Sequence, residues 1–85
     1  MASYSIEIKK SATKEMAKIL KLQLQRIVAK MQSLLADPRP DGCKKLSADE
    51  KYRIRVGDYR ILYKIEDNQL IIYVVKVGHR KGVYR

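Results

Sequence analysis

Residues 52–63 of this 85-residue chain read YRIRVGDYRILY, and this stretch decides the fold. Apolar and basic side chains alternate with a period of two on both sides of Gly57-Asp58, which is the pattern of two half-buried strands. The pair Gly57-Asp58 is a two-residue turn candidate, so it also sets how the two strands pair. We therefore expect a hairpin in which Arg55 lies directly opposite Arg60.

A third strand follows a further turn candidate at residues 67–68. Residues 69–77 then pair with residues 59–66, with Tyr63 opposite Ile72, and complete an antiparallel three-strand meander. One face of the meander is almost wholly apolar and is expected to form the core beneath helices. Its residues are Tyr52, Ile54, Val56, Tyr59, Ile61, Tyr63, Ile65, Leu70, Ile72 and Val74.

The first half of the chain predicts one strand and a helical region. Residues 4–8 alternate polar and apolar side chains, and Ser11 or Thr13 offers a helix cap after them. Apolar residues then recur every three or four positions, as in an amphipathic helix, up to the run DPRPDG at residues 37–42. Proline removes a backbone donor, so this run ends the helix, and a polar connector leads to about Glu50. The apolar series is Met16, Leu20, Leu24, Ile27, Met31 and either Leu34 or Leu35.

The other face of the meander is basic. Arg55 opposite Arg60 sets like charges against each other, at a cost of roughly a few tenths of a kcal/mol unless an anion lies between them. The chain has 19 Lys and Arg against 9 Asp and Glu, a net charge of +10, which indicates a polyanionic partner such as nucleic acid, an anionic membrane or an acidic protein segment. The alternative is a solvated sheet face. This face comprises Arg53, Arg55, Arg60 and Lys64 beside Leu62, Ile71, Tyr73 and Val75.

Composition narrows the setting and the chemistry. Cys43 is the one cysteine, so no internal disulfide can form and a reducing cytoplasm is the simplest location. No stretch has the apolar character of a signal peptide or of a membrane span of about 20 residues, which predicts a soluble cytoplasmic protein with no membrane partner. Paired histidines, clustered carboxylates and zinc-spaced Cys/His groups are absent from the sequence, so no metal or other cofactor is expected. The length suits a single domain over residues 1–85.

Three pieces of the sequence resemble the RelE/ParE toxin superfamily: YRIRVGDYRILY at residues 52–63, VGHR at residues 77–80, and Tyr84 after them. The resemblance covers nearly the whole chain and is most specific in its second half. It implies an α+β fold in which an N-terminal strand, a two-helix hairpin and the three-strand meander follow in order, with the helices packed on one sheet face. The helical region would then break near Lys21, although no glycine or proline marks that position.

Members of the RelE-like branch are toxins of bacterial and archaeal type II toxin-antitoxin systems, and they cleave mRNA. The resemblance therefore implies a metal-independent endoribonuclease in which a ribose 2′-hydroxyl attacks the adjacent phosphate, usually in the ribosomal A site. By motif, its catalytic residues are Arg60, Arg80 and Tyr84. Arg53 and Arg55 stand where close relatives carry lysines. The substrate-binding residues expected around them are Arg53, Arg55, Lys64, Tyr73, His79 and Lys81.

This reaction needs a base, cations around the phosphate and a proton source. Nearby guanidinium groups would lower the pKa of Tyr84 from the ordinary value of about 10 and allow it to act as the base. Arg60 and Arg80 suit the phosphate, because arginine binds phosphate bidentately and hardly gives up its proton. Histidine exchanges a proton near neutral pH, so His79 is a candidate general acid, with a structural role as the alternative.

Two other functions stay open. ParE-like members of the superfamily poison DNA gyrase and lack the nuclease residues, whereas a plain RNA-binding module would retain RNA without cutting it. Tyr84 together with Arg60 and Arg80 favours the nuclease. Any toxin also implies a cognate antitoxin that covers the basic surface with an acidic or amphipathic segment. The other expected partners are mRNA and the ribosome, at its A site and small-subunit rRNA.

Overall fold

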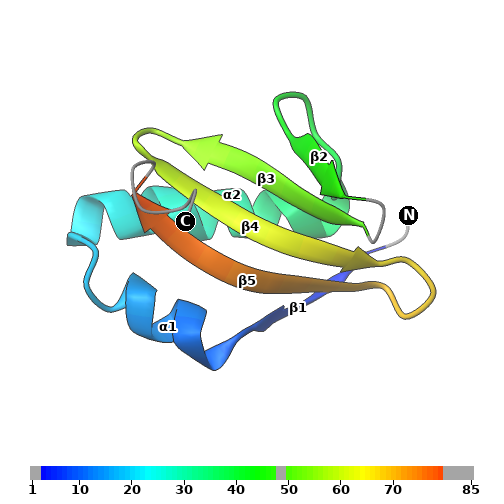
Figure 1. Ribbon diagram of the computed structural model, residues 1–85, viewed down its shortest axis with the longest axis horizontal. Coiled ribbons are helices and arrows are strands. Elements are labelled where there is room, and N and C mark those ends of the chain that lie inside the picture. Colours follow the sequence, from blue (N-terminus) through cyan, green and yellow to red (C-terminus); the bar gives the residue numbers. More distant parts are fainter. Residues whose placement is uncertain (1–2, 48–49, 80–85) are drawn as a thin grey trace.

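A mixed sheet covered on one face by helices forms the fold in a computed structural model that describes residues 3–47 and 50–79. The strand order is β1-β5-β4-β3-β2, with β1 parallel to β5 and all other neighbours antiparallel. Figure 1 shows α2 behind the sheet and α1 below β5. The elements are β1 (Ser5–Ile8), α1 (Lys10–Met16), α2 (Lys21–Ala36), β2 (Lys44–Ser47), β3 (Lys51–Val56), β4 (Tyr59–Glu66) and β5 (Ile71–His79).

The β3–β4 hairpin forms as the sequence predicts. Gly57 takes the first position of the two-residue turn with a φ of 59°, a left-handed conformation that glycine adopts without strain. Arg55 pairs with Arg60, and Val56 pairs with Tyr59. The turn thereby sets the register of both strands and sends successive side chains to opposite faces of the sheet.

The β4–β5 connection differs from the prediction. Its loop contains four residues, 67–70, instead of two, so Tyr63 pairs with Val74 and not with Ile72. A shift by two residues leaves each side chain on its expected face, because the side-chain period of a strand is two. Leu70 is an exception: it lies in the loop with a φ of 55° and is exposed, so its predicted place in the core is wrong.

A bulge further along β5 changes which side chains face the core. Leu62 pairs with Lys76 and Ile61 with Val77, which leaves Val75 as an extra residue between the two regular stretches of the ladder. One extra residue moves every later side chain to the opposite face. Val77 is therefore buried in the core, whereas an unbroken strand would point it away from the helices.

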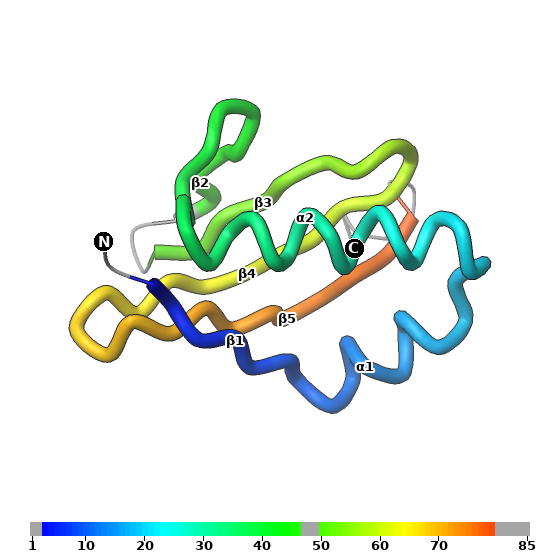
Figure 2. Tube along the Cα trace, turned by 180° about the vertical axis from the view of Figure 1, so that it is seen from behind, coloured from blue at the N-terminus to red at the C-terminus, as the bar shows by residue number. Residues whose placement is uncertain are grey.

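The helical region breaks as expected near Lys21, since residues 17–20 separate α1 from α2. Figure 2, which views the molecule from behind, shows α2 in front of the sheet and α1 on the β5 side. The spacing of three and four residues carries the buried stripe of α2 onto the sheet. This stripe consists of Ile27, Met31 and Leu34.

The helix starts differ from the prediction. Neither Ser11 nor Thr13 caps α1, which begins after Lys9 without a side-chain cap. Thr13 instead directs its hydroxyl back to the Lys9 carbonyl at 3.4 Å. Leu20, predicted in the buried stripe, is 77% exposed and precedes α2. Both helices thus depend on packing against the sheet, the usual source of stability for short helices.

Glu15 joins α1 to the edge of β5. Its carboxylate accepts a hydrogen bond from the backbone N–H of Val77 at 3.1 Å and another from Lys76 Nζ at 2.8 Å. The pairs of β1 with β5 end at Val74, so this carboxylate satisfies a backbone donor beyond the reach of β1. The helix therefore takes the place of a strand at this part of the edge.

The connector after α2 contains a strand that the sequence does not predict. In β2, Lys44 pairs with Arg53 and Lys45 pairs with Tyr52. A short edge strand with charged side chains lacks the apolar alternation by which longer strands are predicted. The pairs with β2 reach Arg53, and the outer edge of β3 continues beyond them.

The core lies between the helices and the predicted apolar face of the sheet. Val56 and Tyr59 pack at its border and are partly buried. Tyr52 stacks on Tyr63 with ring centroids 5.9 Å apart. The central part of the predicted face is confirmed, because its buried residues are Tyr52, Ile54, Ile61, Tyr63, Ile65, Ile72 and Val74.

Candidate nucleic-acid interface

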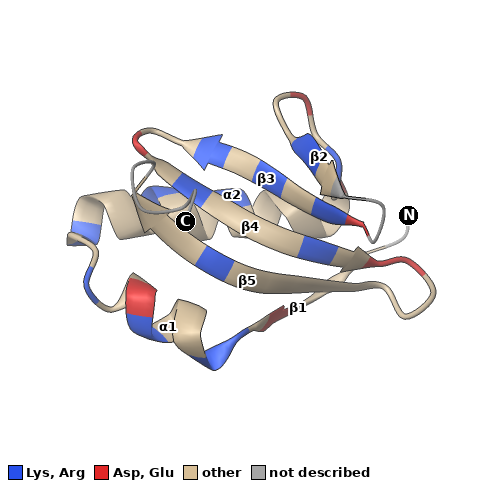
Figure 3. Cartoon of the chain, viewed as in Figure 1, with Lys and Arg blue, Asp and Glu red and all other residues tan. Residues whose placement is uncertain are grey.

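Three arginines lie together on the sheet face opposite the helices. Ile54 and Ile61 point into the core, and side chains alternate along a strand, so the neighbouring arginines point the other way. Figure 3 shows Lys and Arg bands recurring along β3, β4 and β5. The structure thus forms a basic face, defined here by Arg53, Arg55 and Arg60.

The arginines of the basic face differ in exposure. Arg60 is only 7% exposed, whereas Arg55, directly across the ladder, is exposed. Packing holds a buried guanidinium in one place, and an exposed one can adjust to a ligand. Their positive charges face each other on adjacent strands, so an anion bound between them would relieve the repulsion. The pair is therefore suited to a phosphate group.

A cavity of about 550 Å³ opens beside the basic face. It lies where the loop before β2 passes the outer edge of β3. All three arginines of the basic face line it, together with two lysines from α2 and β2 and a single carboxylate. Its lining residues are Lys30, Asp41, Gly42, Cys43, Lys44, Arg53, Ile54, Arg55 and Arg60.

Lys64 and Tyr73 lie on the same face but further along the sheet. They pair with each other across β4 and β5. Lys64 is four residues beyond Arg60 on β4, which is roughly 13 Å along an extended strand. Tyr73 borders a smaller cavity of about 320 Å³ with Glu7 and Lys9. These two residues can therefore contact a long ligand, but not the same phosphate as Arg60.

The structure separates His79 from the basic face. His79 pairs with Tyr59, and the two rings meet edge to face with centroids 5.7 Å apart. Cross-strand partners share a face of the sheet, and Tyr59 packs against the core. His79 thus lies on the helix side, opposite to Arg60.

Three expected site residues, Arg80, Lys81 and Tyr84, lie outside the described residues. Two of them belong to the expected catalytic set. The described part of the site therefore consists of Arg53, Arg55 and Arg60, with Lys64 and Tyr73 beyond them.

Lys30 and Lys44 line the same cavity as the arginines, although the sequence did not predict them as site residues. Lys30 belongs to the polar side of a helix in the sequence pattern, and Lys44 belongs to a connector of unknown path. Their approach to Arg55 depends on how α2 and β2 pack at the edge of β3, and no local signal encodes that packing. The surplus of basic residues, +10 overall, was the one available indication.

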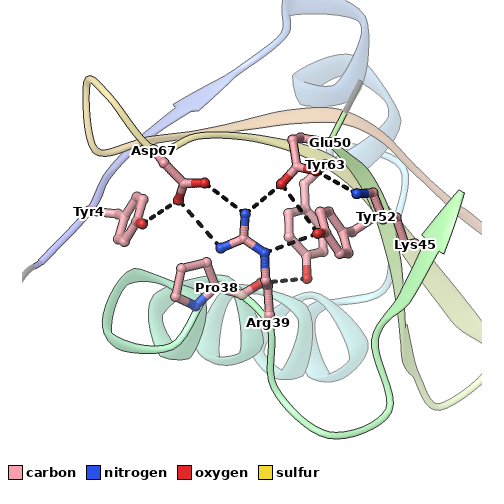
Figure 4. A network of polar contacts seen from close by, with 8 residues as sticks. All are labelled: Tyr4, Pro38, Arg39, Lys45, Glu50, Tyr52, Tyr63 and Asp67. Carbon is pink, nitrogen blue, oxygen red and sulfur yellow. Dashed lines mark hydrogen bonds and ion pairs between the residues drawn. The ribbon is translucent and has the colours of Figure 1, made fainter. Parts of the chain in front are cut away.

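A second charged cluster lies at the opposite end of the β3–β4 hairpin (Figure 4). Arg39 Nη2 donates to Glu50 Oε1 at 2.6 Å and to Asp67 Oδ2 at 2.8 Å, and Arg39 Nε donates to the Tyr52 hydroxyl at 3.0 Å. The Tyr4 hydroxyl donates to Asp67 at 2.6 Å. We call this cluster the Arg39 network, completed by Lys45, which pairs with Glu50, and by Tyr63, which donates to the Pro38 carbonyl.

The Arg39 network shifts the protonation of its members. Hydrogen bonds, from Lys45 first and then Arg39, lower the pKa of the Glu50 carboxyl. Hydrogen bonds from Arg39 and then Tyr4 lower the pKa of the Asp67 carboxyl. Both carboxylates are therefore stabilised in the charged form, and they tie the N-terminal strand, the loop after α2 and the β4–β5 loop together.

Residues 3–47 and 50–79 contain no group of three or more His, Cys, Asp or Glu side chains arranged to hold a metal ion. In the same part of the chain, neither α1 nor α2 qualifies as a membrane-spanning helix.

A family profile described as "ParE toxin of type II toxin-antitoxin system, parDE" matches residues 6–84. The match covers nearly the whole chain, so the protein belongs to this family of toxins within the RelE/ParE superfamily. The resemblance seen in the sequence is confirmed at this level.

Several relatives that are similar to this chain carry the name RelE. The putative toxin RelE1 of Methanocaldococcus jannaschii is 28% identical, over 96% of this chain and 96% of its own length. The mRNA interferase toxin RelE of Escherichia coli strain K12 is 25% identical, over 93% of this chain and 85% of its own. The toxin-antitoxin complex RelBE2 from Mycobacterium tuberculosis contains a chain with 25% identity and a TM-score of 0.79, covering 92% of this chain and 99% of that one. The predicted α+β fold of the RelE type is thereby confirmed.

Proposed function

We propose that this toxin is a ribosome-dependent mRNA endoribonuclease that inhibits translation. The observation that carries the proposal is the grouping of Arg53, Arg55 and Arg60 around one cavity on the face opposite the helices. Arginine forks match the geometry of phosphate, and a cluster of them stabilises the charge that a phosphate gains during cleavage. The name of the Escherichia coli relative, an mRNA interferase, supports the same reading.

In the proposed reaction, the 2′-oxygen of one ribose forms a bond to the adjacent phosphorus, and the bond from phosphorus to the 5′-oxygen of the next nucleotide breaks. Tyr84, as phenolate, takes the proton of the 2′-hydroxyl. Arg60 and Arg80 hold the phosphate oxygens as negative charge develops. The products carry a 2′,3′-cyclic phosphate and a 5′-hydroxyl, and no metal or other cofactor takes part.

Burial of Arg60 makes it the best placed cation for this role. Its 7% exposure fixes the guanidinium before substrate binds, so little reorganisation is needed in the transition state. Arginine transfers protons poorly, so Arg53 and Arg55 act as an electrostatic clamp and not as an acid or base.

The position of His79 argues against a role in proton transfer. It lies on the side of Tyr59, with its ring against that residue, and the sheet separates it from Arg60. The proton for the 5′-oxygen therefore comes from another group or from water. His79 keeps a structural role at the end of β5 under this proposal.

We further propose that a cognate antitoxin covers the basic face. The Mycobacterium tuberculosis relative is part of a toxin-antitoxin complex, which supports a partner of this kind. An acidic segment over Arg53, Arg55 and Arg60 would neutralise their charge and exclude RNA. The remaining partners would be mRNA and the ribosome, at the A site and its small-subunit rRNA.

A DNA gyrase poison is the second candidate function, because the matching family profile names ParE. Such a toxin would act through protein contacts and would not need Tyr84 or Arg80. Primer-extension mapping of mRNA from briefly induced cells separates the two. Discrete cuts within translated codons that disappear in Tyr84→Phe and Arg80→Ala support the nuclease. Growth arrest with intact transcripts and damaged DNA would instead support the gyrase poison.

A further inference from the structure

The cavity beside the basic face reaches around the edge of β3. Ile54 in its lining belongs to the helix side of the sheet, whereas Arg53 and Arg55 belong to the opposite side. The ladder between β2 and β3 ends at the pair of Lys44 with Arg53, so the next residues of β3 border the cavity. Lys30 of α2 also lines the cavity. A chain that leaves the basic face here can pass over the sheet edge.

The charge of this cavity is strongly one-sided. Two lysines and three arginines line it, against the single carboxylate of Asp41. So many cations in one concave lining create a potential that attracts an anion. Lys30 and Lys44 have no place in the proposed cleavage step, so their position indicates a second phosphate contact beyond the one that Arg60 holds.

The size and the lining favour a nucleotide as the occupant. Sites for small molecules and cofactors measure about 300–1,000 Å³, and this cavity has about 550 Å³. A protein helix, roughly 10 Å across with its side chains, is far bulkier than such a ligand. Asp41, the carboxylate of this lining, is exposed and can accept a hydrogen bond from a base amine or a ribose hydroxyl.

We propose that this cavity is a nucleotide subsite: it binds one nucleotide of the RNA next to the cleaved bond, with Lys30 and Lys44 on its phosphate. The inference rests on the proposed RNA substrate and extends it, because it assigns a binding site outside the catalytic set. It also gives a path for the RNA, from the basic face over the edge of β3.

Binding of uncleavable RNA tests the subsite apart from the chemistry. Fluorescence anisotropy would measure the full chain with 2′-O-methyl oligonucleotides of two to seven nucleotides at several salt concentrations. The test variant is Lys30→Gln/Lys44→Gln. The matched control is Lys14→Gln/Lys21→Gln, which removes the same charge from exposed helix positions outside the cavity lining.

We expect the test variant to bind the longer oligonucleotides roughly tenfold more weakly than the control variant, and to lower the slope of log affinity against log salt by about 0.7, the value for one phosphate. Oligonucleotides too short to reach the cavity should show no such difference. Equal binding by the two variants at every oligonucleotide length would overturn the subsite. Failure of the wild type to cut ribosome-bound mRNA would remove the proposed function alone, because this assay needs no cleavage.

Discussion

The two ends of the β3–β4 hairpin both concentrate charge, but they balance it differently. In the Arg39 network, Arg39 and Lys45 face the two carboxylates of Glu50 and Asp67, so the charges cancel within the protein. At the other end, five cations share a cavity lining with Asp41 alone. A cluster that neutralises itself serves the fold, whereas a cluster with a large surplus of one sign serves a ligand of the opposite sign.

One loop connects the two clusters. Arg39 anchors the chain after α2 to Tyr52 and the β4–β5 loop, and the next residues, 41–43, form a wall of the cavity. The Tyr63 hydroxyl donates to the Pro38 carbonyl at 2.8 Å and fixes the start of the same loop. Burial raises the pKa of Tyr63, so its hydroxyl stays a donor at any physiological pH. The Arg39 network thereby holds in place the loop that forms a wall of the cavity.

The largest effect should follow from Arg60→Ala at the basic end. Loss of a fixed cation that stabilises developing charge typically costs about 10²–10³ in rate. Single-turnover cleavage of ribosome-bound mRNA measures this loss of rate. The assay is run at a temperature at which a thermal unfolding curve shows that the variant is still folded. Arg60→Lys should be intermediate, because it keeps the charge but not the fork. Cleavage by Arg60→Ala at the wild-type rate would show that the basic end of the hairpin does not stabilise the transition state.

Arg39→Gln should have a smaller effect, on stability and not on chemistry. We expect a loss of about 1 kcal/mol, discounted because the network is partly exposed, and a Tm lower by about 5 °C. At saturating substrate, the cleavage rate per folded molecule should stay at the wild-type value, because Arg39 anchors the loop beside the cavity and does not hold Arg60 in the β3–β4 hairpin. Thermal unfolding measures the loss of stability. The control is Arg26→Gln, at an exposed residue of α2. A variant that is as stable as wild type would show that the network does not hold the fold.

The Arg39 network should also make stability depend on pH. The pKa values of Glu50 and Asp67 are lowered in the folded protein, so the unfolded state binds protons first as the pH falls. The stabilisation is fully present above the unfolded pKa values, near about 4, and is lost as the pH falls through the folded ones. Urea unfolding between about pH 6 and pH 3 should show a steeper loss for wild type than for Arg39→Gln. Parallel curves would contradict the account.

Lys64→Gln should produce the smallest change. Lys64 lies on the same side of the sheet as Arg60 but roughly 13 Å along the strand from it. It can therefore contact only a phosphate other than the one that Arg60 binds. We expect the salt slope for a long RNA to fall by about 0.7, with no change in the cleavage rate at saturating substrate. Lys21→Gln is the control at an exposed helix position. A large loss of cleavage rate in Lys64→Gln would show that the cleaved phosphate lies nearer to Lys64 than to Arg60.

The basic face could be predicted from the sequence because one turn sets its geometry. Gly57 and Asp58 fix the register of β3 and β4, and the alternation then separates Arg55 and Arg60 from the apolar side chains. Only residues close together in the sequence determine this geometry. Its result, Arg55 paired with Arg60, is confirmed.

The register of β5 could not be predicted in the same way. The β4–β5 loop ends on Leu70 with a φ of 55°, a conformation that a leucine rarely takes and that no sequence signal marks. The bulge at Val75 then reverses the faces of β5. Both features depend on how β5 meets β1 and α1, and hence on contacts across the whole chain.

The cavity and the Arg39 network are equally non-local. Lys30, Lys44 and Arg55 come from three elements, and a short polar edge strand brings Lys44 to its place. Arg39 meets Asp67 across 28 residues of sequence. Periodicity describes one helix or strand at a time. It therefore identifies the cations that share the sheet face, but not the cations of other elements that lie beside them.

The proposed cleavage of mRNA by this toxin is tested most directly by the effect of the 2′-hydroxyl at the cut site. Purified ribosomes would be programmed with an mRNA that carries a single 2′-deoxy nucleotide at the mapped cleavage position, beside the unmodified mRNA. We expect wild-type protein to cut the unmodified mRNA, leaving a 2′,3′-cyclic phosphate and a 5′-hydroxyl, and to leave the 2′-deoxy mRNA intact. Cleavage of both mRNAs, or of neither, would contradict a basic face that acts on a phosphate attacked by its neighbouring 2′-hydroxyl.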